Sequence, residues 1–232
     1  MGGQPAIKAA SQVSVDAAIT VGQPAGEPDY VSRGGRKLAG ALAAFPDLTV
    51  AGRRCLDAGA STGGFTDVLL RAGAAHVVAV DVGYGQLAWS LRTDERVTVL
   101  ERVNVRTLTP DQVAPAPGLV VADLSFISLA LVLPALVACA AADADFLLMV
   151  KPQFEVGKDL VRDGVVRDPG LRATAVSAVA AAASRLGLGV LGITASPLPG
   201  PAGNVEYFLW LRRGAPPLDA GDLRRAIAEG PQ

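Results

Sequence analysis

The sequence predicts an α/β fold with a seven-stranded, mostly parallel sheet, an antiparallel last strand and helices on both faces. From residue 53 onward, short runs that are apolar almost throughout alternate with segments of helical length. Strands buried on both faces have this composition, and helices that cover both faces of a parallel sheet explain the alternation. Near the C-terminus two strand-like runs are separated only by a loop rich in Pro and Gly, which predicts a hairpin at the edge of the sheet.

Each expected element can be placed along the chain. A first helix is expected at residues 35–45, where Leu38, Leu42 and Phe45 share one helical face. Strands are expected at 53–57, 76–81, 96–101, 118–123, 146–151, 188–197 and 205–214. Further helices are expected at 63–73, 85–92, 127–141, 171–187 and 218–230. A seven-stranded sheet that finishes in this way describes the Rossmann-like sheet of class I methyltransferases.

The 232 residues suit one or at most two domains, and we expect the boundary near residue 28. Residues 12–21 alternate like a short strand, and a Gly- and Pro-rich linker follows them. The net charge of −1 and the 5% aromatic content exclude a disordered chain and an overtly basic nucleic-acid binder. The basic residues are mostly arginine, since the chain has 17 Arg and only four Lys. A lysine in such a chain indicates a role that needs a compact charge.

Two cysteines and one histidine exclude a disulfide framework and a zinc site of Cys and His, so no metal site is expected. The start of the chain lacks the pattern of a signal peptide, and a cytoplasmic location is the default. Residues 124–142 have no charge over 19 positions, close to the length of a membrane span. Pro134, Ser125 and Ser128 interrupt this segment, so we expect a packed crossover helix, with a membrane-active segment as the alternative.

The sharpest local pattern is a strand that ends in an acid and a glycine-rich turn that opens a helix. The residues concerned are Asp57, Gly59, Ser61, Thr62, Gly63, Gly64 and Phe65. Glycines permit a tight turn and a close approach of a ligand, and the helix N-terminus presents its N–H groups there. The G-x-x-x-G-G spacing departs from the dinucleotide fingerprint. An acid just before the turn suits the ammonium group of S-adenosylmethionine and would repel a pyrophosphate, so we predict that cofactor rather than NAD.

A second acid supports this prediction. Asp81 ends the next strand, 22 residues after Gly59, with Val82 beside it. A carboxylate at that place accepts hydrogen bonds from ribose hydroxyls. Asn104, after the third strand, either contacts the adenine edge or belongs to an ordinary surface turn.

The atom that accepts the methyl group is inferred by excluding nitrogen and carbon acceptors. The turn after the fourth strand reads Asp123-Leu124-Ser125-Phe126, without the two prolines that are usual in amino methyltransferases. Methylation of a pyrimidine carbon needs a cysteine nucleophile, and Cys55 and Cys139 both fall within expected core elements. An oxygen acceptor remains.

Four charged residues flank the expected carboxyl edge of the sheet, where such folds bind their ligands. Lys37 precedes the first strand, Asp123 and Lys151 end the fourth and fifth strands, and Glu206 starts the last one. Any one of them alone could be a surface charge, but four at one edge indicate a catalytic set.

The sequence resembles the TlyA proteins, hemolysin-like members of the FtsJ-type ribose 2′-O-methyltransferases. The resemblance spans about residues 30–213 and rests on SRGGRKL, DAGASTGGF, DVGYGQLAWSLR, VVADLSFISL, VKPQFEVGK and SPLPGPAGNVEYFLWL. It implies transfer from S-adenosylmethionine to cytidine ribose in the rRNA of both ribosomal subunits, with an effect on susceptibility to capreomycin-type inhibitors. The family's Lys-Asp-Lys-Glu set corresponds to Lys37, Asp123, Lys151 and Glu206. Members usually begin with a small RNA-binding module, and we expect residues 1–28 to be its remnant and residues 29–232 to be the methyltransferase domain.

We expect the Lys151 ammonium to donate to the 2′-oxygen and aim its lone pair at the methyl group. Lys37 would steer a phosphate or share the proton network. A local basic patch is expected to contact RNA through Arg33, Arg36, Lys37, Lys158 and Arg162, with Arg53 and Arg54 adding to its charge. The chain is expected to act as a monomer without stable membrane association. The alternatives are a membrane-active hemolysin and an enzyme that methylates a small-molecule hydroxyl.

Overall fold

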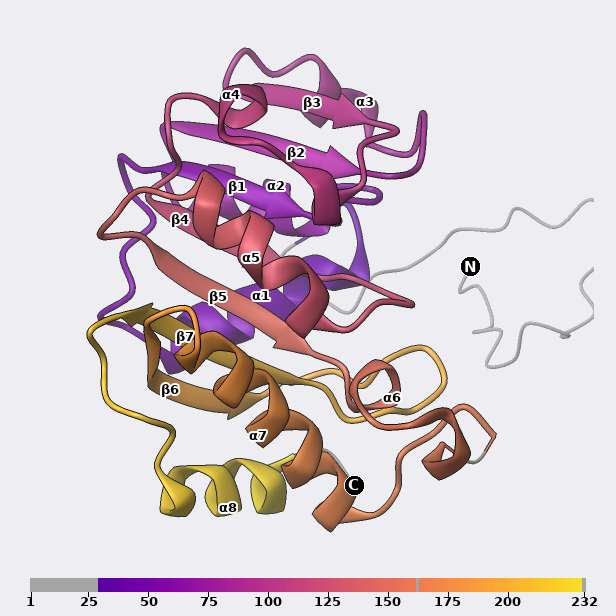
Figure 1. Ribbon diagram of the computed structural model, residues 1–232. Helices are drawn as coiled ribbons and strands as arrows, with labels where there is room; N and C mark the ends of the chain where they lie inside the picture. Colours follow the sequence, from indigo (N-terminus) through magenta and orange to yellow (C-terminus); the bar gives the residue numbers. More distant parts are fainter. Residues whose placement is uncertain (1–28, 162, 231–232) are drawn as a thin grey trace, which may run out of the picture.

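The computed structural model describes residues 29–161 and 163–230 of the chain (Figure 1). The strand expected at residues 12–21 and the predicted RNA contact Arg162 lie outside this range, as does the side chain of Lys158.

The described chain forms a seven-stranded sheet in the order β3-β2-β1-β4-β5-β7-β6, which confirms the predicted fold class. The pairs β1–β2, β1–β4, β2–β3 and β4–β5 are parallel, and β7 is antiparallel to both β5 and β6. The strands are β1 (Arg54–Ala58), β2 (His76–Asp81), β3 (Val97–Glu101), β4 (Leu119–Ala122), β5 (Asp145–Val150), β6 (Leu188–Ala195) and β7 (Tyr207–Arg213). The last strand is therefore antiparallel, as predicted, but it lies inside the sheet, and β6 forms the edge.

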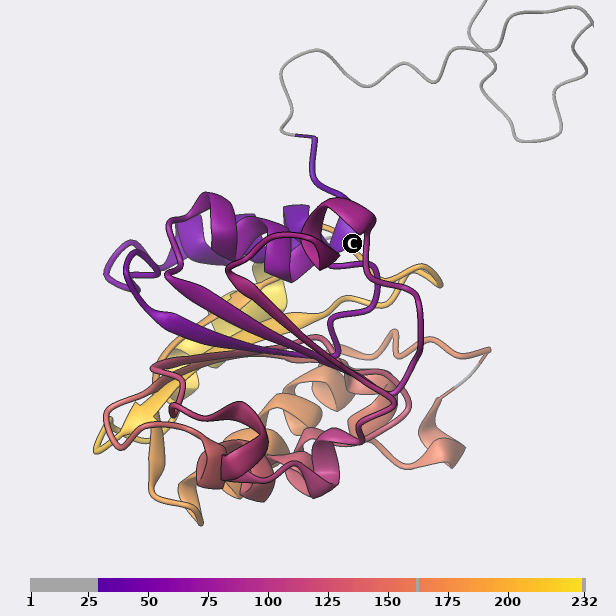
Figure 2. The same cartoon turned by 90° about the horizontal axis from the view of Figure 1, so that it is seen from above.

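Helices cover both faces of the sheet and enclose two apolar cores (Figure 2). One core lies under α1 (Arg33–Ala44), α2 (Gly64–Arg71) and α3 (Trp89–Arg92). The other lies under α5 (Leu129–Cys139), α7 (Pro169–Ser184) and α8 (Ala220–Glu229). The strands between them are buried on both sides, which explains their apolar composition.

The uncharged segment forms a packed crossover helix, as predicted. Helix α5 has 11 residues with Pro134 inside it, and Leu129, Val132, Leu133 and Leu136 are buried in the core. Among residues 29–161 and 163–230, no helix is both long and apolar enough to cross a membrane.

Short elements at the carboxyl edge differ from the prediction. The helix expected at 85–92 begins only at Trp89, because a turn with Gly85 at φ +69° occupies its first part. The strand expected to reach Lys151 ends at Val150, and α6 (Pro152–Glu155) follows at once. The short elements η1 (Val105–Thr107), α4 (Pro110–Val113) and η2 (Lys158–Leu160) were not predicted. Of these, η1 belongs to the wall of the site described below.

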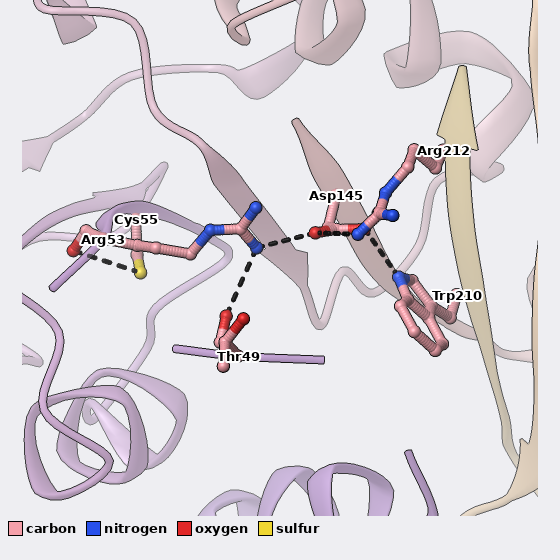
Figure 3. A network of polar contacts seen from close by, with 6 residues as sticks. All are labelled: Thr49, Arg53, Cys55, Asp145, Trp210 and Arg212. Carbon is pink, nitrogen blue, oxygen red and sulfur yellow. Dashed lines mark hydrogen bonds and ion pairs between the residues drawn. The ribbon is translucent and has the colours of Figure 1, made fainter. Parts of the chain in front are cut away.

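A buried carboxylate joins β5 to β7 and to the segment before β1 at the amino ends of the parallel strands (Figure 3). Asp145 accepts hydrogen bonds from Arg53 at 2.6 Å, from Arg212 at 2.8 and 2.9 Å, and from the Trp210 indole at 2.8 Å. Arg54 donates to the backbone oxygens of Val113 and Ala114. The expectation that Arg53 and Arg54 add to the basic patch is therefore wrong, since both are engaged at the edge away from the proposed site.

Candidate active site

Two cavities, of about 390 and 480 Å³, lie side by side at the carboxyl edge of the parallel strands. In Figure 1 the arrowheads of β1, β2 and β5 point to this edge. Turns after β1 and β4 separate the two cavities and line both of them through Gly59, Ser61, Asp123 and Ser125. The two cavities therefore form one groove with a narrow middle.

The glycine-rich turn after β1 lines this groove. Gly59 has φ +87°, and a Cβ there would lie 2.7 Å from the backbone oxygen of Asp123. Gly63 has φ +100°, and a Cβ on Gly64 would lie 2.2 Å from Ser32 Oγ. Larger residues would therefore push apart the turn and the start of α1. Of the predicted cofactor residues in this turn, five line the first cavity: Gly59, Ser61, Thr62, Gly64 and Phe65.

Asp57 lies beneath the turn and is fully buried. Its Oδ2 accepts a hydrogen bond from Thr66 Oγ1 at 2.7 Å, whereas Oδ1 is buried without a partner. Burial raises the pKa of Asp57 to about 7, the Thr66 hydrogen bond opposes this rise, and the charges of Asp123 and Asp81 add to it. Asp57 lines neither cavity, so its direct contact with a cofactor stays a prediction. A buried acid with a free oxygen favours a cation nearby.

The second cavity has the polar groups that an adenosine needs. Asp81 lines it and accepts the N–H groups of Ser61 and Gly83, each at 2.7 Å, which fixes the carboxylate at the cavity wall. Asn104 also lines the cavity, while its Oδ1 accepts the Arg106 N–H at 3.0 Å and begins η1. Asn104 therefore belongs to a turn and also lines the cavity, while its contact with adenine stays a prediction. Val82 lines this cavity too, and its contact with the cofactor likewise stays a prediction.

The four predicted catalytic residues form two lysine–carboxylate pairs. Lys151 Nζ lies 2.6 Å from Asp123 Oδ1 and donates to Ser125 Oγ at 2.9 Å. Lys37 Nζ lies 2.5 Å from Glu206 Oε2. Because Val150 is opposite Tyr207 in the antiparallel register, Lys151 and Glu206 leave neighbouring strands at the same end. Asp123 and Lys151 line the first cavity.

The second pair is more deeply buried than the first. The side chain of Glu206 is 1% exposed and that of Lys37 is 8% exposed. The expectation that Lys37 contacts an RNA phosphate is therefore not supported, since its ammonium is buried against Glu206. Arg33 is exposed and lines the first cavity, at the start of α1. Arg36 lies on the same helix and is partly buried.

Several residues of the groove were not predicted to bind a ligand. Ser32, Ser125, Phe126 and Gln86 line one cavity or the other, and a motif search by charge or glycine content does not single them out. Phe126 has φ +64°, a backbone conformation that is rare for a bulky residue. Its side chain is 91% exposed. Its position in the same turn as Asp123 is the sequence signal that could have identified it.

The exposed aromatic residues of the described chain all lie at this edge. Tyr84 is 68% exposed, Trp89 75% and Phe126 91%. The Arg102 guanidinium lies 4.3 Å from the centre of the Tyr84 ring, and Arg102 itself has φ +57°. We call these four residues the aromatic–arginine surface. Aromatic rings and arginines of this kind stack on unpaired nucleobases.

The groove fits S-adenosylmethionine. The floor at Gly59 admits close contact, the Asp81 carboxylate stands where ribose hydroxyls would bind, and the partnerless oxygen of Asp57 adds negative potential below the turn. Within residues 29–161 and 163–230, no group of three or more His, Cys, Asp or Glu residues could hold a metal ion.

Comparisons with known proteins agree with this geometry. Residues 30–213 match the FtsJ-like methyltransferase family. The chain is 63% identical over 235 aligned positions to the 16S/23S rRNA (cytidine-2′-O)-methyltransferase TlyA of Mycobacterium tuberculosis, covering 99% of this chain and 87% of that protein.

Two further relatives carry hemolysin names. Hemolysin A of Brachyspira hyodysenteriae is 38% identical, covering 77% of this chain and 75% of that protein. A solved structure of a hemolysin-named protein from Streptococcus thermophilus has a TM-score of 0.84 and 40% identity, covering 89% of this chain and 76% of that one.

Proposed function

The chain belongs to the TlyA group of FtsJ-like methyltransferases, and from this premise we propose that it methylates the ribose 2′-oxygen of cytidine in ribosomal RNA. It is an S-adenosylmethionine-dependent enzyme. The observation that supports this reaction best is the Lys151–Asp123 pair, with Ser125, at the wall of the glycine-floored cavity. The relative from M. tuberculosis, which is named for this reaction, gives the substrate class.

We assign S-adenosylmethionine to the groove with its adenosine in the second cavity and its methionine end in the first. Asp81 would accept the ribose hydroxyls, Asn104 would contact the adenine, and the turn at Gly59, Ser61, Thr62, Gly63, Gly64 and Phe65 would enclose the methionine end above Asp57. The bound cofactor supplies an electrophilic methyl group. Asp123 lines both cavities. In this assignment it would contact the middle of the cofactor.

The protein's main contribution is orientation. Displacement at a methyl group needs the attacking oxygen, the carbon and the leaving sulfur in line, and holding that geometry removes much of the barrier. The Lys151 ammonium is held by an ion pair with Asp123 at 2.6 Å and by a hydrogen bond to Ser125 at 2.9 Å, and an ammonium has three protons, so it can also donate to the 2′-oxygen. That hydrogen bond directs an oxygen lone pair toward the methyl group.

The proton of the 2′-hydroxyl leaves late in this scheme. An oxygen that has gained a methyl group is strongly acidic, so Asp123 or water can accept its proton at that stage. The buried Lys37–Glu206 pair holds the end of β7 next to Lys151 and would extend the proton network. This retains one of the two roles expected for Lys37.

RNA would approach across the mouth of the groove. Arg33 stands beside the first cavity and the aromatic–arginine surface beside the second. We propose that Arg33 and Arg36 contact phosphates, and that Tyr84, Phe126 and Arg102 stack against unpaired bases near the target nucleotide. We place the predicted contacts Lys158 and Arg162, which follow α6 in the sequence, on the same RNA.

We further propose that residues 29–232 are the methyltransferase domain and that it acts as a monomer in the cytoplasm. Loss of the modification should alter susceptibility to capreomycin-type inhibitors, which the family resemblance implies.

The test is to map transfer of a tritiated methyl group onto ribosomal subunits from a strain that lacks the modification. We expect label at the 2′-oxygen of a cytidine, detected as a stop in primer extension at low nucleotide concentration. Lys151→Ala should bind S-adenosylhomocysteine as the wild type does and transfer no label. Label on a base atom, or on a small hydroxyl compound in preference to rRNA, would refute the proposal.

A further inference from the structure

Two turns at the carboxyl edge hold the parts of the Lys151–Asp123 pair, and they leave neighbouring strands. The first turn, residues 123–128, follows β4 and contains Asp123 and Ser125. The second, residues 151–155, follows β5 and begins with Lys151. Strands β4 and β5 are parallel neighbours, with Ala122 opposite Leu148. The relative position of the two turns therefore decides the geometry of the pair.

A carboxylate outside the cavities joins the two turns. Glu155, the last residue of α6, accepts a hydrogen bond from Ser128 Oγ at 2.6 Å with one oxygen and from the Leu129 N–H at 2.8 Å with the other. Leu129 is the first residue of α5, so its N–H has no partner within the helix. The negative charge also lies at the positive end of the helix dipole. We call these contacts the Glu155 clasp.

The location of Glu155 argues for a deliberate contact. Burial raises the pKa of the Glu155 carboxyl, and the hydrogen bonds from Ser128 and the Leu129 N–H oppose that rise. Ser128 already begins α5 by accepting the Ala130 N–H at 3.2 Å, so the helix does not need Glu155 for an N-terminal cap. Besides accepting the Leu129 N–H, the Glu155 clasp links the two turns.

The turn that the clasp holds is strained. Phe126 has a positive φ, and its ring packs against Phe154 of α6 with 5.1 Å between ring centres. Unfavourable backbone conformations persist only where surrounding contacts fix them. Three contacts fix this turn to the one after β5: the Lys151 bonds, the ring pair and the Glu155 clasp. The Glu155 clasp joins the last residue of the first turn to the last residue of the second.

We propose that Glu155 is a positioning residue for methyl transfer, which holds the turn of Asp123 and Ser125 against the turn of Lys151. Glu155 lines neither cavity. Its hydrogen bonds go to Ser128 and Leu129 rather than to Asp123, Ser125 or Lys151. Its effect is to keep the ammonium aimed at the acceptor oxygen. This inference rests on the proposed function and adds a residue that acts through the catalytic pair.

The test measures single-turnover methyl transfer to rRNA at saturating substrates, with KM and binding of S-adenosylhomocysteine measured separately. Glu155→Ala should lower kcat by about a hundredfold, because a displacement of about 1 Å costs that much, with both KM values and the cofactor affinity within about twofold of wild type. Ser128→Ala removes one of the two hydrogen bonds and should lower kcat by about tenfold. This milder variant keeps the test valid if Glu155→Ala does not fold.

Two further variants separate positioning from other roles. Glu155→Gln keeps the shape, and its carbonyl can accept the Leu129 N–H while its amide donates to Ser128, so activity should be within about threefold of wild type. Asp219→Ala is the matched control: Asp219 accepts two N–H groups at the start of α8, at 2.7 and 2.9 Å, away from the site. It should lower the melting temperature and leave kcat unchanged.

The outcomes distinguish this inference from the proposed function. If Glu155→Ala resembles Asp219→Ala, or raises only the KM for RNA, Glu155 does not position the catalytic pair. A Glu155→Gln enzyme as slow as Glu155→Ala would show that the charge matters and not the geometry, and would also overturn the inference. A wild-type enzyme that methylates no rRNA would instead refute the proposed function.

Discussion

Lys151 concentrates the proposed chemistry in one ammonium group with two fixed partners. Lys151 forms an ion pair with Asp123 at 2.6 Å and donates a hydrogen bond to Ser125 at 2.9 Å, and these two contacts restrict the position of the ammonium. An arginine at this position has a planar fork that cannot place one N–H along the same line. The use of lysine here, in a chain with so few lysines, follows from that geometry.

Replacement of Lys151 by Arg should therefore abolish most activity although the charge is kept. We expect kcat to fall by at least about a hundredfold, because the donor no longer points at the acceptor oxygen. Binding of S-adenosylhomocysteine, measured by calorimetry, should remain within about twofold. Near-wild-type turnover by the Arg variant would exclude a specific role for the lysine.

Asp57 makes stability depend on pH. Burial raises the pKa of this acid to about 7, whereas an unfolded chain leaves it near the ordinary value of 3.8. Between these two values the folded state holds a proton that the unfolded state has lost, so the free energy of unfolding falls as pH rises from about 4 to 7. Below this window both states are protonated and the effect is absent.

Asp57→Asn should remove this dependence. The amide keeps the Thr66 contact and has no charge to bury, so the variant should gain stability relative to the wild type as pH rises toward 7, by up to about 1.4 kcal/mol per pH unit. Urea unfolding at pH 5, 6, 7 and 8 measures the difference. If the free energy of unfolding changes with pH in the same way for both proteins across this range, Asp57 does not cause the pH dependence.

At the scale of elements, Asp145 fastens β5 to β7 and to the segment before β1. Burial would raise the pKa of Asp145, but hydrogen bonds from Arg212, Trp210 and Arg53 outweigh burial and hold the pKa below its ordinary value. A lowered carboxyl pKa contributes stability above the ordinary pKa, which is lost as pH falls through the folded value. The network should therefore stabilise the sheet at neutral pH.

Asp145→Ala should lower the free energy of unfolding at pH 7 by about 1–3 kcal/mol, because it leaves the buried Trp210 N–H without its partner, whereas the two partly exposed arginines can reach water. The cavities lie at the opposite edge, so S-adenosylhomocysteine affinity should be unchanged while the protein is folded. Urea unfolding and calorimetry measure the two quantities. A loss of cofactor affinity with unchanged stability would reverse this division of roles.

The elements could be predicted from sequence to the extent that a repeating pattern defines them. Strands such as β1 and β4 are apolar because both faces are covered, and the turn at Gly59 has the only residue type that fits it. The elements α6 and η1 are single turns whose start depends on one residue, Lys151 or Asn104. No period exists in three or four residues, so these turns were missed.

The site shows the same limit. Lys37, Asp123, Lys151 and Glu206 could be found because each is a charge next to an expected strand end. The contact between Asp123 and Lys151 could also be expected, because they follow neighbouring parallel strands. The Lys37–Glu206 pair could not, because it depends on the position of β7 between β5 and β6. The contacts of Arg53 and Arg54 were missed for a related reason, since Asp145 is 92 residues away from Arg53 in sequence.

At the scale of the whole molecule, the local charge at the carboxyl edge of the sheet differs from the net charge of the chain. The net charge of −1 hides a carboxyl edge where the exposed Arg33 lines the first cavity, and the exposed Arg102 and Arg106 lie within two residues of Asn104, which lines the second. Asp81 and Asp123 lie within the groove, where a cationic cofactor offsets them. The surface that would meet RNA is therefore more basic than the composition indicates.

This distribution predicts that the affinity for RNA falls steeply with salt, although the net charge of the chain is −1. Each phosphate contact contributes about 0.7–0.9 to the slope of log affinity against log salt, because it releases condensed counterions. Arg33→Ala and Arg106→Ala should each reduce the slope by about that amount in filter-binding titrations of an rRNA fragment. Arg213→Ala is the matched control, since Arg213 is exposed at the end of β7, at the edge away from the groove. If all three variants keep the wild-type slope, RNA reaches the ribose-methylating groove by another face. If the control alone changes it, the basic edge has been placed on the wrong side of the sheet.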